Sequence, residues 1–368
     1  MPDRRLSVLI SGGGIAGGAL ACLLAQGGHR VTVVERDQGI RSSGNPVDVR
    51  GDAFDVVERL NLVSRLQDAA TSVRQLVFVD TAGQRLASMA TRWSQDREVE
   101  VPRADLSAAL VNAARDGADF RFDDTIFEIE ADGHGVDVTF ERAAPDRFDL
   151  VVGADGLHST VRRLAFGPES DYLTDLGMYV ATVRLQNALE RADTVLMYNE
   201  PGAATALHPG TGKPIAAFMF RSTTQVNSRD ADAAKELMTA VYGNAGWRAP
   251  ELVAAYLAAT DTYFDTVSRV RLPTWTKGLV TLLGDAASCV SLFGEGSSSA
   301  IQGAATLAES LDASPQNVPA ALARYQAKHR TVTSRRQRGV PIASHLLVPA
   351  SRAGITLRNS ALRLARRR

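Results

Sequence analysis

The sequence is poor in cysteine and has no long hydrophobic run. Its 368 residues include only two cysteines, Cys22 and Cys289. Their positions suit neither a disulfide framework nor a metal site, so a reducing cytoplasm is the expected compartment. No apolar stretch approaches the roughly 20 residues that cross a bilayer. The apolar run Leu6–Ile10, although it follows Arg4 and Arg5, is too short for the core of a signal peptide.

Acidic residues are missing from the C-terminal part of the chain. None follows Asp312, although the whole chain has 41 acidic and 41 basic residues. A basic tail can bind nucleic acid or an anionic membrane surface, but this one lacks the aromatic residues that stack on bases. We therefore expect no nucleic-acid partner, and we favour a solvated face on C-terminal helices that pack against an acidic body.

Side-chain signatures of catalysis are also missing. There is no Ser-His-Asp or metal-binding arrangement, and His158, His208, His329 and His345 stand apart in the sequence. The composition, with 45% apolar and 22% charged residues, is ordinary for a globular protein of this length. The absence of a nucleophile is compatible with chemistry supplied by a bound cofactor.

The strongest positive signal lies at the N-terminus. The apolar run Leu6–Ile10 leads into the glycine-rich stretch 11–17, which is followed by a helical segment rich in alanine and leucine. A second apolar run begins after Arg30 and ends at Glu35. This order of strand, glycine turn, helix, strand and acid is typical of a dinucleotide-binding βαβ unit. A plain strand–helix turn is the alternative.

Each part of this unit has a physical task. Gly12 permits the tight turn, Gly14 lets a pyrophosphate approach the backbone, and Gly17 lets the helix pack closely on the sheet. The unpaired N–H groups at the helix N-terminus attract phosphate, and Glu35 can accept hydrogen bonds from a ribose. The expected ligand is an adenine dinucleotide.

Two later strands also end in acids. An apolar strand before Asp155 and another before Asp285 repeat the pattern, and a second glycine-rich stretch leads into the helix that follows Ser297. NAD needs only the first unit. FAD is longer, and its ribityl chain and its reduced, negatively charged ring can use a further acceptor and a second helix N-terminus.

The remaining chain predicts a second domain. Consecutive strand candidates at 179–185, 194–198, 203–208 and 214–221 indicate an antiparallel sheet. The expected fold class is α/β, with a Rossmann-like FAD-binding domain, an antiparallel-sheet substrate domain and long C-terminal helices. We assign 1–170 and 276–335 to the discontinuous FAD-binding domain, 171–275 to the sheet domain, and 336–368 to a basic C-terminal helix.

Three ordered motifs carry a family resemblance. Gly12-x-Gly14-x-x-Gly17 with Glu35-Arg36, the stretch 153–162 around Asp155, and Gly284-Asp285-Ala-Ala resemble the motifs of FAD-dependent aromatic hydroxylases. These are the p-hydroxybenzoate hydroxylase-like single-component flavoprotein monooxygenases. The compact length, the loop with Asp48 and the long C-terminal helix are most similar to the branch with tetracycline-inactivating monooxygenases.

The resemblance implies roles for matching positions. Glu35 and Arg36 would lie at the adenosine, Arg103 and Asp48 near the phosphate or ribityl region, and Asp285 at the ribityl chain. Asp155 would contact FAD and, transiently, NADPH or NADH. The implied cofactor-binding residues are Gly12, Gly13, Gly14, Ile15, Ala16, Gly17, Glu35, Arg36, Asp48, Arg103, Asp155, Asp285, Gly294, Gly296, Ser297 and Ser298.

The implied function is an NAD(P)H- and O2-dependent monooxygenase that hydroxylates an aromatic or polyketide-like molecule through a flavin C4a-hydroperoxide. Ser288 stands in place of His or Tyr, Leu292 stands in place of Pro, and the loop is one residue shorter. These departures motivate an alternative without oxygen insertion, a flavin-dependent reductase or dehydrogenase. A non-catalytic binder of small aromatics is a third possibility. We expect a monomer or homodimer.

The sheet domain should cover the flavin ring and form the substrate pocket. Residues that would line it are Met197, His208, Met219, Phe220 and Phe293. The alternative for each is an ordinary place in the core.

Overall fold

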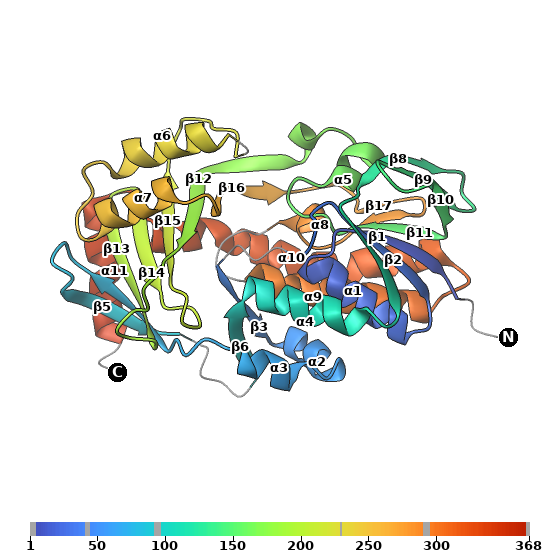
Figure 1. Ribbon diagram of the computed structural model, residues 1–368, viewed down its shortest axis with the longest axis horizontal. Coiled ribbons are helices and arrows are strands. Elements are labelled where there is room, and N and C mark those ends of the chain that lie inside the picture. Colours follow the sequence, from blue (N-terminus) through green and yellow to red (C-terminus); the bar gives the residue numbers. More distant parts are fainter. Residues whose placement is uncertain (1–4, 41–44, 92–96, 229, 290–294, 366–368) are drawn as a thin grey trace.

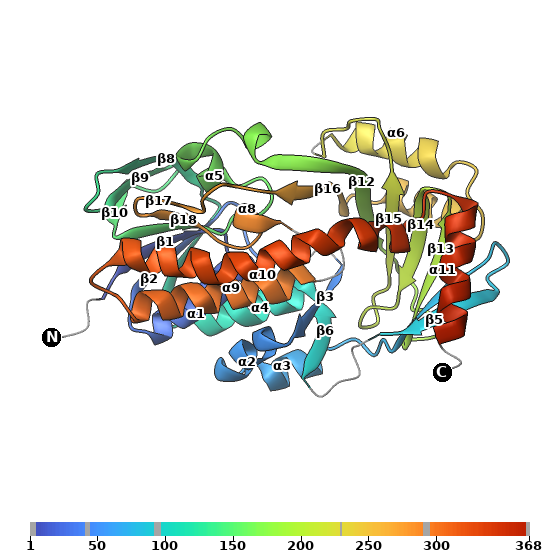
Figure 2. The same ribbon diagram turned by 180° about the vertical axis from the view of Figure 1, so that it is seen from behind.

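The protein, described here by a computed structural model, has two lobes connected by a long helix (Figure 1). The structure describes residues 5–40, 45–91, 97–228, 230–289 and 295–365. One lobe is built on a six-stranded, mainly parallel sheet and the other on a seven-stranded, mainly antiparallel sheet. Helix α10 (Val318–Leu347) runs along the first lobe and reaches the second, as Figure 2 shows.

The first sheet has the strand order β17-β18-β11-β1-β2-β7. Strands β2, β1, β11 and β18 are mutually parallel, so their carboxyl ends meet at one edge. Their residues are almost continuously apolar and buried, as parallel strands covered on both faces require. The strands are β1 (Ser7–Ser11), β2 (Arg30–Glu35), β7 (Ala118–Phe122), β11 (Leu150–Gly153), β17 (Thr276–Lys277) and β18 (Val280–Leu282).

Helices and a small sheet cover the two faces of this parallel sheet (Figure 2). On one face α1 packs against α4 and α9, and α9 packs against α10. The other face carries α5 and the three-stranded sheet β10-β9-β8. The bounds are α1 (Ile15–Gln26), α4 (Arg103–Ala114), α5 (Thr160–Ala165), α9 (Glu295–Asp312), β8 (Ile126–Ala131), β9 (Val136–Phe140) and β10 (Asp146–Phe148).

The second lobe has the strand order β16-β12-β15-β14-β13-β4-β5. One face, here called the outer face, packs against α6 and α7, and the opposite inner face receives residues from α10 and α11. The bounds are β4 (Gln75–Val79), β5 (Arg85–Ala90), β12 (Leu173–Arg184), β13 (Thr194–Glu200), β14 (Ala203–His208), β15 (Ile215–Arg221), β16 (Thr262–Val270), α6 (Ala231–Tyr242), α7 (Ala249–Ala258) and α11 (Arg352–Ala365).

A short two-stranded sheet, β3 with β6, lies between the lobes (Figure 1). The antiparallel register sets Asp48 of β3 opposite Glu100 of β6. The remaining elements are β3 (Pro46–Arg50), β6 (Glu98–Pro102), α2 (Asp52–Arg59), α3 (Val63–Asp68), α8 (Asp285–Ser288) and the short 3₁₀ helix at Glu169–Asp171.

The predicted fold class is confirmed, and two features of the connectivity bear on the proposed domain boundaries. Strands β4 and β5, which lie within the segment 1–170, form the edge of the seven-stranded sheet through a parallel pairing of β4 with β13. Helix α10 is continuous across residue 335. Pairing between strands so far apart in the sequence leaves no local signal, which explains why the sequence did not predict it.

Candidate functional site

The glycine-rich turn after β1 combines two crowded positions with one open position. A Cβ on Gly17 would lie 1.9 Å from the Gly12 carbonyl oxygen, and Gly12 itself has a φ of +102°. At Gly14, in contrast, no atom lies within 4 Å of the place that a Cβ would take. Gly12 and Gly17 are therefore needed for packing, whereas Gly14 leaves a free approach to the backbone.

Helix α1 begins at this open position. Its N-cap is Gly14, no side chain caps it, and its first turn has no acid. The N-terminal N–H groups of Ile15, Ala16 and Gly17 belong to the end that carries the positive pole of the helix dipole. This uncapped N-terminus of a 12-residue helix fits the pyrophosphate of a dinucleotide.

Glu35 is at the end of β2 and fixes the turn from the side. Its carboxylate accepts hydrogen bonds from the Gly13 N–H, at 2.7 Å, and from the Asp37 N–H, at 3.0 Å. Arg36 is exposed, and its Nε lies 4.0 Å from Asp37 Oδ1. The acid predicted for the ribose thus stands directly beside the glycine turn.

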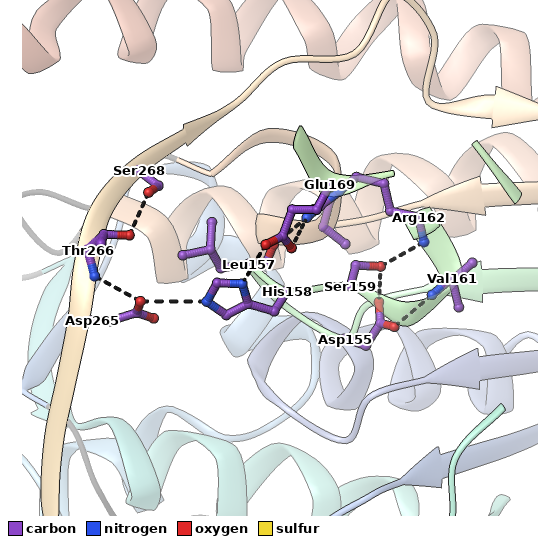
Figure 3. Close-up of polar contacts among 11 residues, drawn as sticks. Asp155, Leu157, His158, Ser159, Val161, Arg162, Glu169, Asp265, Thr266 and Ser268 are labelled. Carbon is purple, nitrogen blue, oxygen red and sulfur yellow. Dashed lines mark hydrogen bonds and ion pairs between the residues drawn. The ribbon is translucent and has the colours of Figure 1, made fainter. Parts of the chain in front are cut away.

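Asp155 follows β11 and organises its own loop (Figure 3). The carboxylate accepts hydrogen bonds from the Ser159 hydroxyl and, at 3.0 Å, from the Val161 N–H. Ser11 Oγ, at the end of β1, lies 3.5 Å away. Burial raises the pKa of Asp155, and these hydrogen bonds oppose that rise. Asp155 therefore connects the second motif to the glycine turn.

Sequence reasoning missed a group of charged residues around this loop (Figure 3). Arg162 is fully buried and donates to the carbonyl of Ala286 at 3.1 Å and to Glu169 at 2.9 Å. His158 Nδ1 lies 3.0 Å from Glu169, and its Nε2 lies 3.6 Å from Asp265 on β16. The two carboxylates, that of Asp265 first, raise the pKa of His158. These contacts link the second motif to the third motif, through Ala286, and to the other lobe, through Asp265. No spacing in the sequence predicts them.

Asp285 is the first residue of α8, which follows β18. Burial raises the pKa of its carboxyl group, and the nearby Arg103 guanidinium opposes that rise. Burial also raises the pKa of Tyr263 on β16, again opposed by Arg103, and the pKa of Cys289, with Asp285 as a further cause. Helix α8 contacts β16, so Asp285 at its start and Cys289 at its end lie near the strand of Tyr263, and the charge of Arg103 acts on all three groups. Tyr263 and Cys289 were not predicted as site residues.

Asp48 and the start of α9 are bound to each other. The hydroxyls of Ser297 and Ser298 donate to the Asp48 carbonyl at 2.7 and 2.9 Å. Asp285 Oδ1 lies 4.0 Å from the place of a Cβ on Gly296. Asp48, Gly296, Ser297, Ser298 and Asp285 are therefore brought together at one end of the parallel sheet.

Gly294 and Phe293, predicted for the cofactor and substrate sites, lie outside the described residues.

The carboxyl edge of the parallel sheet has the layout that a long coenzyme needs. Glu35 ends β2, the glycine turn follows β1, Asp155 follows β11 and Asp285 comes after β18. Three strand intervals separate β2 from β18, which corresponds to about 14 Å. One extended dinucleotide can therefore run along this edge from Glu35 to Asp285. Together with the open Gly14 and the uncapped α1, this layout fits FAD.

The residues predicted to contact substrate divide between the two faces of the second sheet. Met197 and Met219 lie on the inner face. Phe220 lies on the outer face, fully buried, where its ring packs against Tyr179 and Tyr242 beneath α6. Phe220 therefore belongs to the core of the lobe, and we leave it out of the proposed substrate site.

His208 connects the lobes. Its Nδ1 accepts a hydrogen bond from the Gly210 N–H at 3.0 Å, so Nε2 carries the ring proton. Nε2 lies 3.4 Å from Glu100 Oε1 on β6. Both ring nitrogens thus have protein partners, and the side chain ties β14 to the sheet that contains Asp48.

Among the described residues, no group of His, Cys, Asp and Glu is arranged to hold a metal ion. The helices of that same part of the chain include none that is both long and apolar enough to cross a membrane.

The fold and the layout at the sheet edge define a dinucleotide-binding flavoprotein, and comparisons with known proteins identify the family. The family model for the FAD binding domain matches residues 5–338. An uncharacterized protein of Mycobacterium tuberculosis is 36% identical over 345 residues, covering 90% of this chain and 91% of its own length. A flavin-dependent monooxygenase of an unknown prokaryotic organism is 34% identical over 332 residues, covering 88% of this chain and 86% of its own.

A solved structure supports the same assignment. The tetracycline destructase Tet(55) superimposes with a TM-score of 0.86 at 31% identity, covering 98% of this chain and 96% of its own. The chain therefore belongs to the FAD binding domain family, among the flavin-dependent monooxygenases, and is an FAD-dependent oxidoreductase. The family predicted from the three sequence motifs is confirmed.

Proposed function

We propose that this protein is a single-component monooxygenase that uses NADPH or NADH and O2 to hydroxylate an aromatic or polyketide-like small molecule. The observation that carries the proposal is the alignment of Glu35, the glycine turn, Asp155 and Asp285 along one sheet edge, with α8, which begins at Asp285, in contact with β16 of the second sheet. The similarity to tetracycline destructases supports the substrate class.

The proposed roles follow from the positions of the side chains. Glu35 and Arg36 would hold the adenosine end, and the N–H groups that begin α1 would hold the pyrophosphate. Asp285 would accept hydrogen bonds from the ribityl chain, and Arg103 would balance the charge of that carboxylate and the phosphate. Bound FAD would supply the electron transfer and the activation of O2.

The N-terminus of α9 would stabilise negative charge on the reduced ring. Ser297 and Ser298 orient this helix end through their hydrogen bonds to Asp48. A helix dipole in such a place contributes a few tenths to about 2 kcal/mol.

The inner face of the seven-stranded sheet is the proposed substrate side. Half-buried Met219, backed by the more deeply buried Met197, would supply an apolar, adaptable surface, and Tyr263 would lie near Arg103. His208 would act through its contact with Glu100 by fixing the distance between the sheets. The proposal also places the enzyme in the cytoplasm, where Cys22 and Cys289, both buried and free, remain reduced.

An oxygen-labelling experiment tests the proposal. The purified protein is expected to show a flavin absorption spectrum and to oxidise NADPH or NADH faster when a suitable phenol or polyketide is present. With ¹⁸O2, the product is expected to gain one labelled oxygen atom. Unlabelled product, formed equally well without oxygen, would indicate a flavin-dependent reductase or dehydrogenase instead. Ligand binding by a protein that takes up no FAD would indicate a non-catalytic binder.

A further inference from the structure

Helix α11 carries two polar residues inward and two of its three leucines outward, whereas Leu362 packs on the sheet. Arg358 and Asn359 are 6% and 5% exposed, whereas Leu357 and Leu364 are 73% and 65% exposed. This is the reverse of the usual arrangement of a surface helix, whose apolar stripe faces the core. Leu357 and Leu364 therefore do not contribute to the packing of the helix on its own lobe.

The inward side holds α11 in a fixed orientation. The guanidinium carbon of Arg358 lies 3.8 Å from the centroid of the Phe78 ring. Arg358 Nη1 donates to the Asn199 side chain at 2.8 Å and to the Leu346 carbonyl at 3.0 Å. At the far end of the helix, Arg363 Nε donates to the Leu86 carbonyl. Because these contacts fix the rotation of the helix, the exposure of the leucines is a property of the fold.

The two leucines form one face. Residues seven apart lie on the same side of an α-helix. The exposed Ala361 lies on this side between the two leucines, and the exposed Ala353 lies one turn before Leu357. The described residues include five exposed large apolar side chains, and three of these, Leu346, Leu357 and Leu364, lie at the C-terminal end. We call Leu357 and Leu364 the leucine face.

The charged residues of α11 have one sign. Arg352 and Arg363 are exposed on α11, and the sequence continues to Arg366-Arg367-Arg368. No acidic residue follows Asp312, so the helix has no carboxylate of its own to offset these cations. Pairing of two copies through this face would bring arginines together. A negatively charged surface would be attracted instead.

An apolar face beside exposed arginines matches the requirements of an anionic bilayer. We propose that the leucine face, with Arg352 and Arg363, docks this protein on the surface of a membrane that contains anionic phospholipid. The leucines would enter the boundary between headgroups and acyl chains, and the arginines would pair with lipid phosphates. The helix would lie in the plane of the interface.

Vesicle sedimentation of the intact FAD-containing protein tests this proposal. Binding to vesicles with about one third phosphatidylglycerol is expected to exceed binding to pure phosphatidylcholine at least about tenfold, and to fall when salt is added. The double variant Leu357→Ser/Leu364→Ser is expected to lose at least about tenfold in vesicle affinity. Arg352→Gln is expected to lose about fivefold, since one interfacial arginine contributes about 1 kcal/mol.

Phe127→Ser is the matched control, because Phe127 is 65% exposed on β8 in the other lobe. It is expected to bind vesicles within about twofold of the unmodified protein, since surface substitutions of this kind have small effects. FAD content and thermal unfolding verify that every variant is folded.

Three results would overturn the proposal. The first is equal binding to anionic and neutral vesicles, and the second is an equal loss for the leucine and Phe127 variants. The third is a dimer that the leucine substitutions dissociate without any change in vesicle binding, which would assign the face to a second copy of the chain.

Discussion

The two sheets of this protein differ in where their proposed binding residues lie, at the strand ends in one and on a strand face in the other. In the parallel sheet, the groups proposed to bind FAD gather at one edge, and the backbone would supply much of this site through glycines and a helix N-terminus. In the seven-stranded sheet, the strand faces matter, because the outer face is covered by α6 and α7 and the inner face packs against the ends of α10 and α11. The first site is therefore sensitive to backbone geometry, and the second to the identity of alternate side chains.

The contrast appears within single elements. In the glycine turn, Gly14 and Gly17 are three residues apart, and one is open while the other is in close contact with the Gly12 carbonyl. On β15, Met219 and Phe220 are adjacent and lie on opposite faces. Substitutions at such neighbours can separate folding from ligand binding.

The largest effect is expected for Gly17→Ala. Its Cβ would lie 1.9 Å from a backbone oxygen that has no side-chain freedom with which to yield. We expect a loss of about 3 kcal/mol or more in the free energy of unfolding, together with loss of bound FAD. Urea unfolding and the flavin spectrum measure both. Gly39→Ala, at a position with no atom within 4 Å, is the control that should leave both unchanged. A yellow Gly17→Ala protein of normal stability would contradict this reading of the turn.

Substitutions on the two faces of the second sheet should have different effects, and Phe220→Ala tests the outer face. Loss of this fully buried ring is expected to cost about 3–5 kcal/mol of unfolding free energy. Met219→Ala, on the half-buried inner side, should cost less than half as much and should instead alter the KM for substrate. Chemical unfolding and steady-state kinetics test the pair. If Phe220→Ala changed KM at unaltered stability, the assignment of the faces would be wrong.

Arg162→Met should weaken the link between the second and third motifs. It removes hydrogen bonds to the Ala286 carbonyl and to Glu169, and we expect a loss of about 2–3 kcal/mol in the free energy of unfolding. The adjacent Arg163 is exposed, so Arg163→Met should change stability by less than about 0.5 kcal/mol. Similar losses in the two variants would show that the buried contacts of Arg162 contribute little.

His158→Gln should have the smallest effect on stability, and this effect should depend on pH. Because Asp265 and Glu169 raise its pKa in the folded protein, its stabilising contribution is complete below the unfolded pKa, about 6.5. That contribution is lost as the pH rises through the raised folded pKa. The difference in Tm between the unmodified protein and His158→Gln should therefore shrink from pH 6 to pH 8. A difference that grows over this range would contradict the sign.

The sequence predicted the parallel sheet well, because each part of it has a local signal. An apolar run followed by glycine or an acid marks a strand end, and the motifs around Gly14, Asp155 and Asp285 lie at the edge where they were expected. In the second lobe, the strands predicted at 194–198, 203–208 and 214–221 also lie close to the observed bounds of β13, β14 and β15.

The features that were missed depend on contacts distant in the sequence. The edge strands β4 and β5 join the second sheet through β13, more than a hundred residues away. The pairing of His158 with Asp265 joins the two lobes in the same way. An alternating strand shows which residues share a face but does not show which face is covered by helices, so the sequence left open whether Phe220 lies in the substrate pocket or in the core.

The binding of FAD to Gly14→Val tests the central claim most directly. The backbone at Gly14 is extended, and no atom lies within 4 Å of its missing Cβ, so the apoprotein should fold with unchanged Tm. The new side chain would occupy the space through which the pyrophosphate approaches α1, and the Kd for FAD should rise at least about a hundredfold. An unchanged Kd would place the coenzyme elsewhere and contradict this account of the sheet edge.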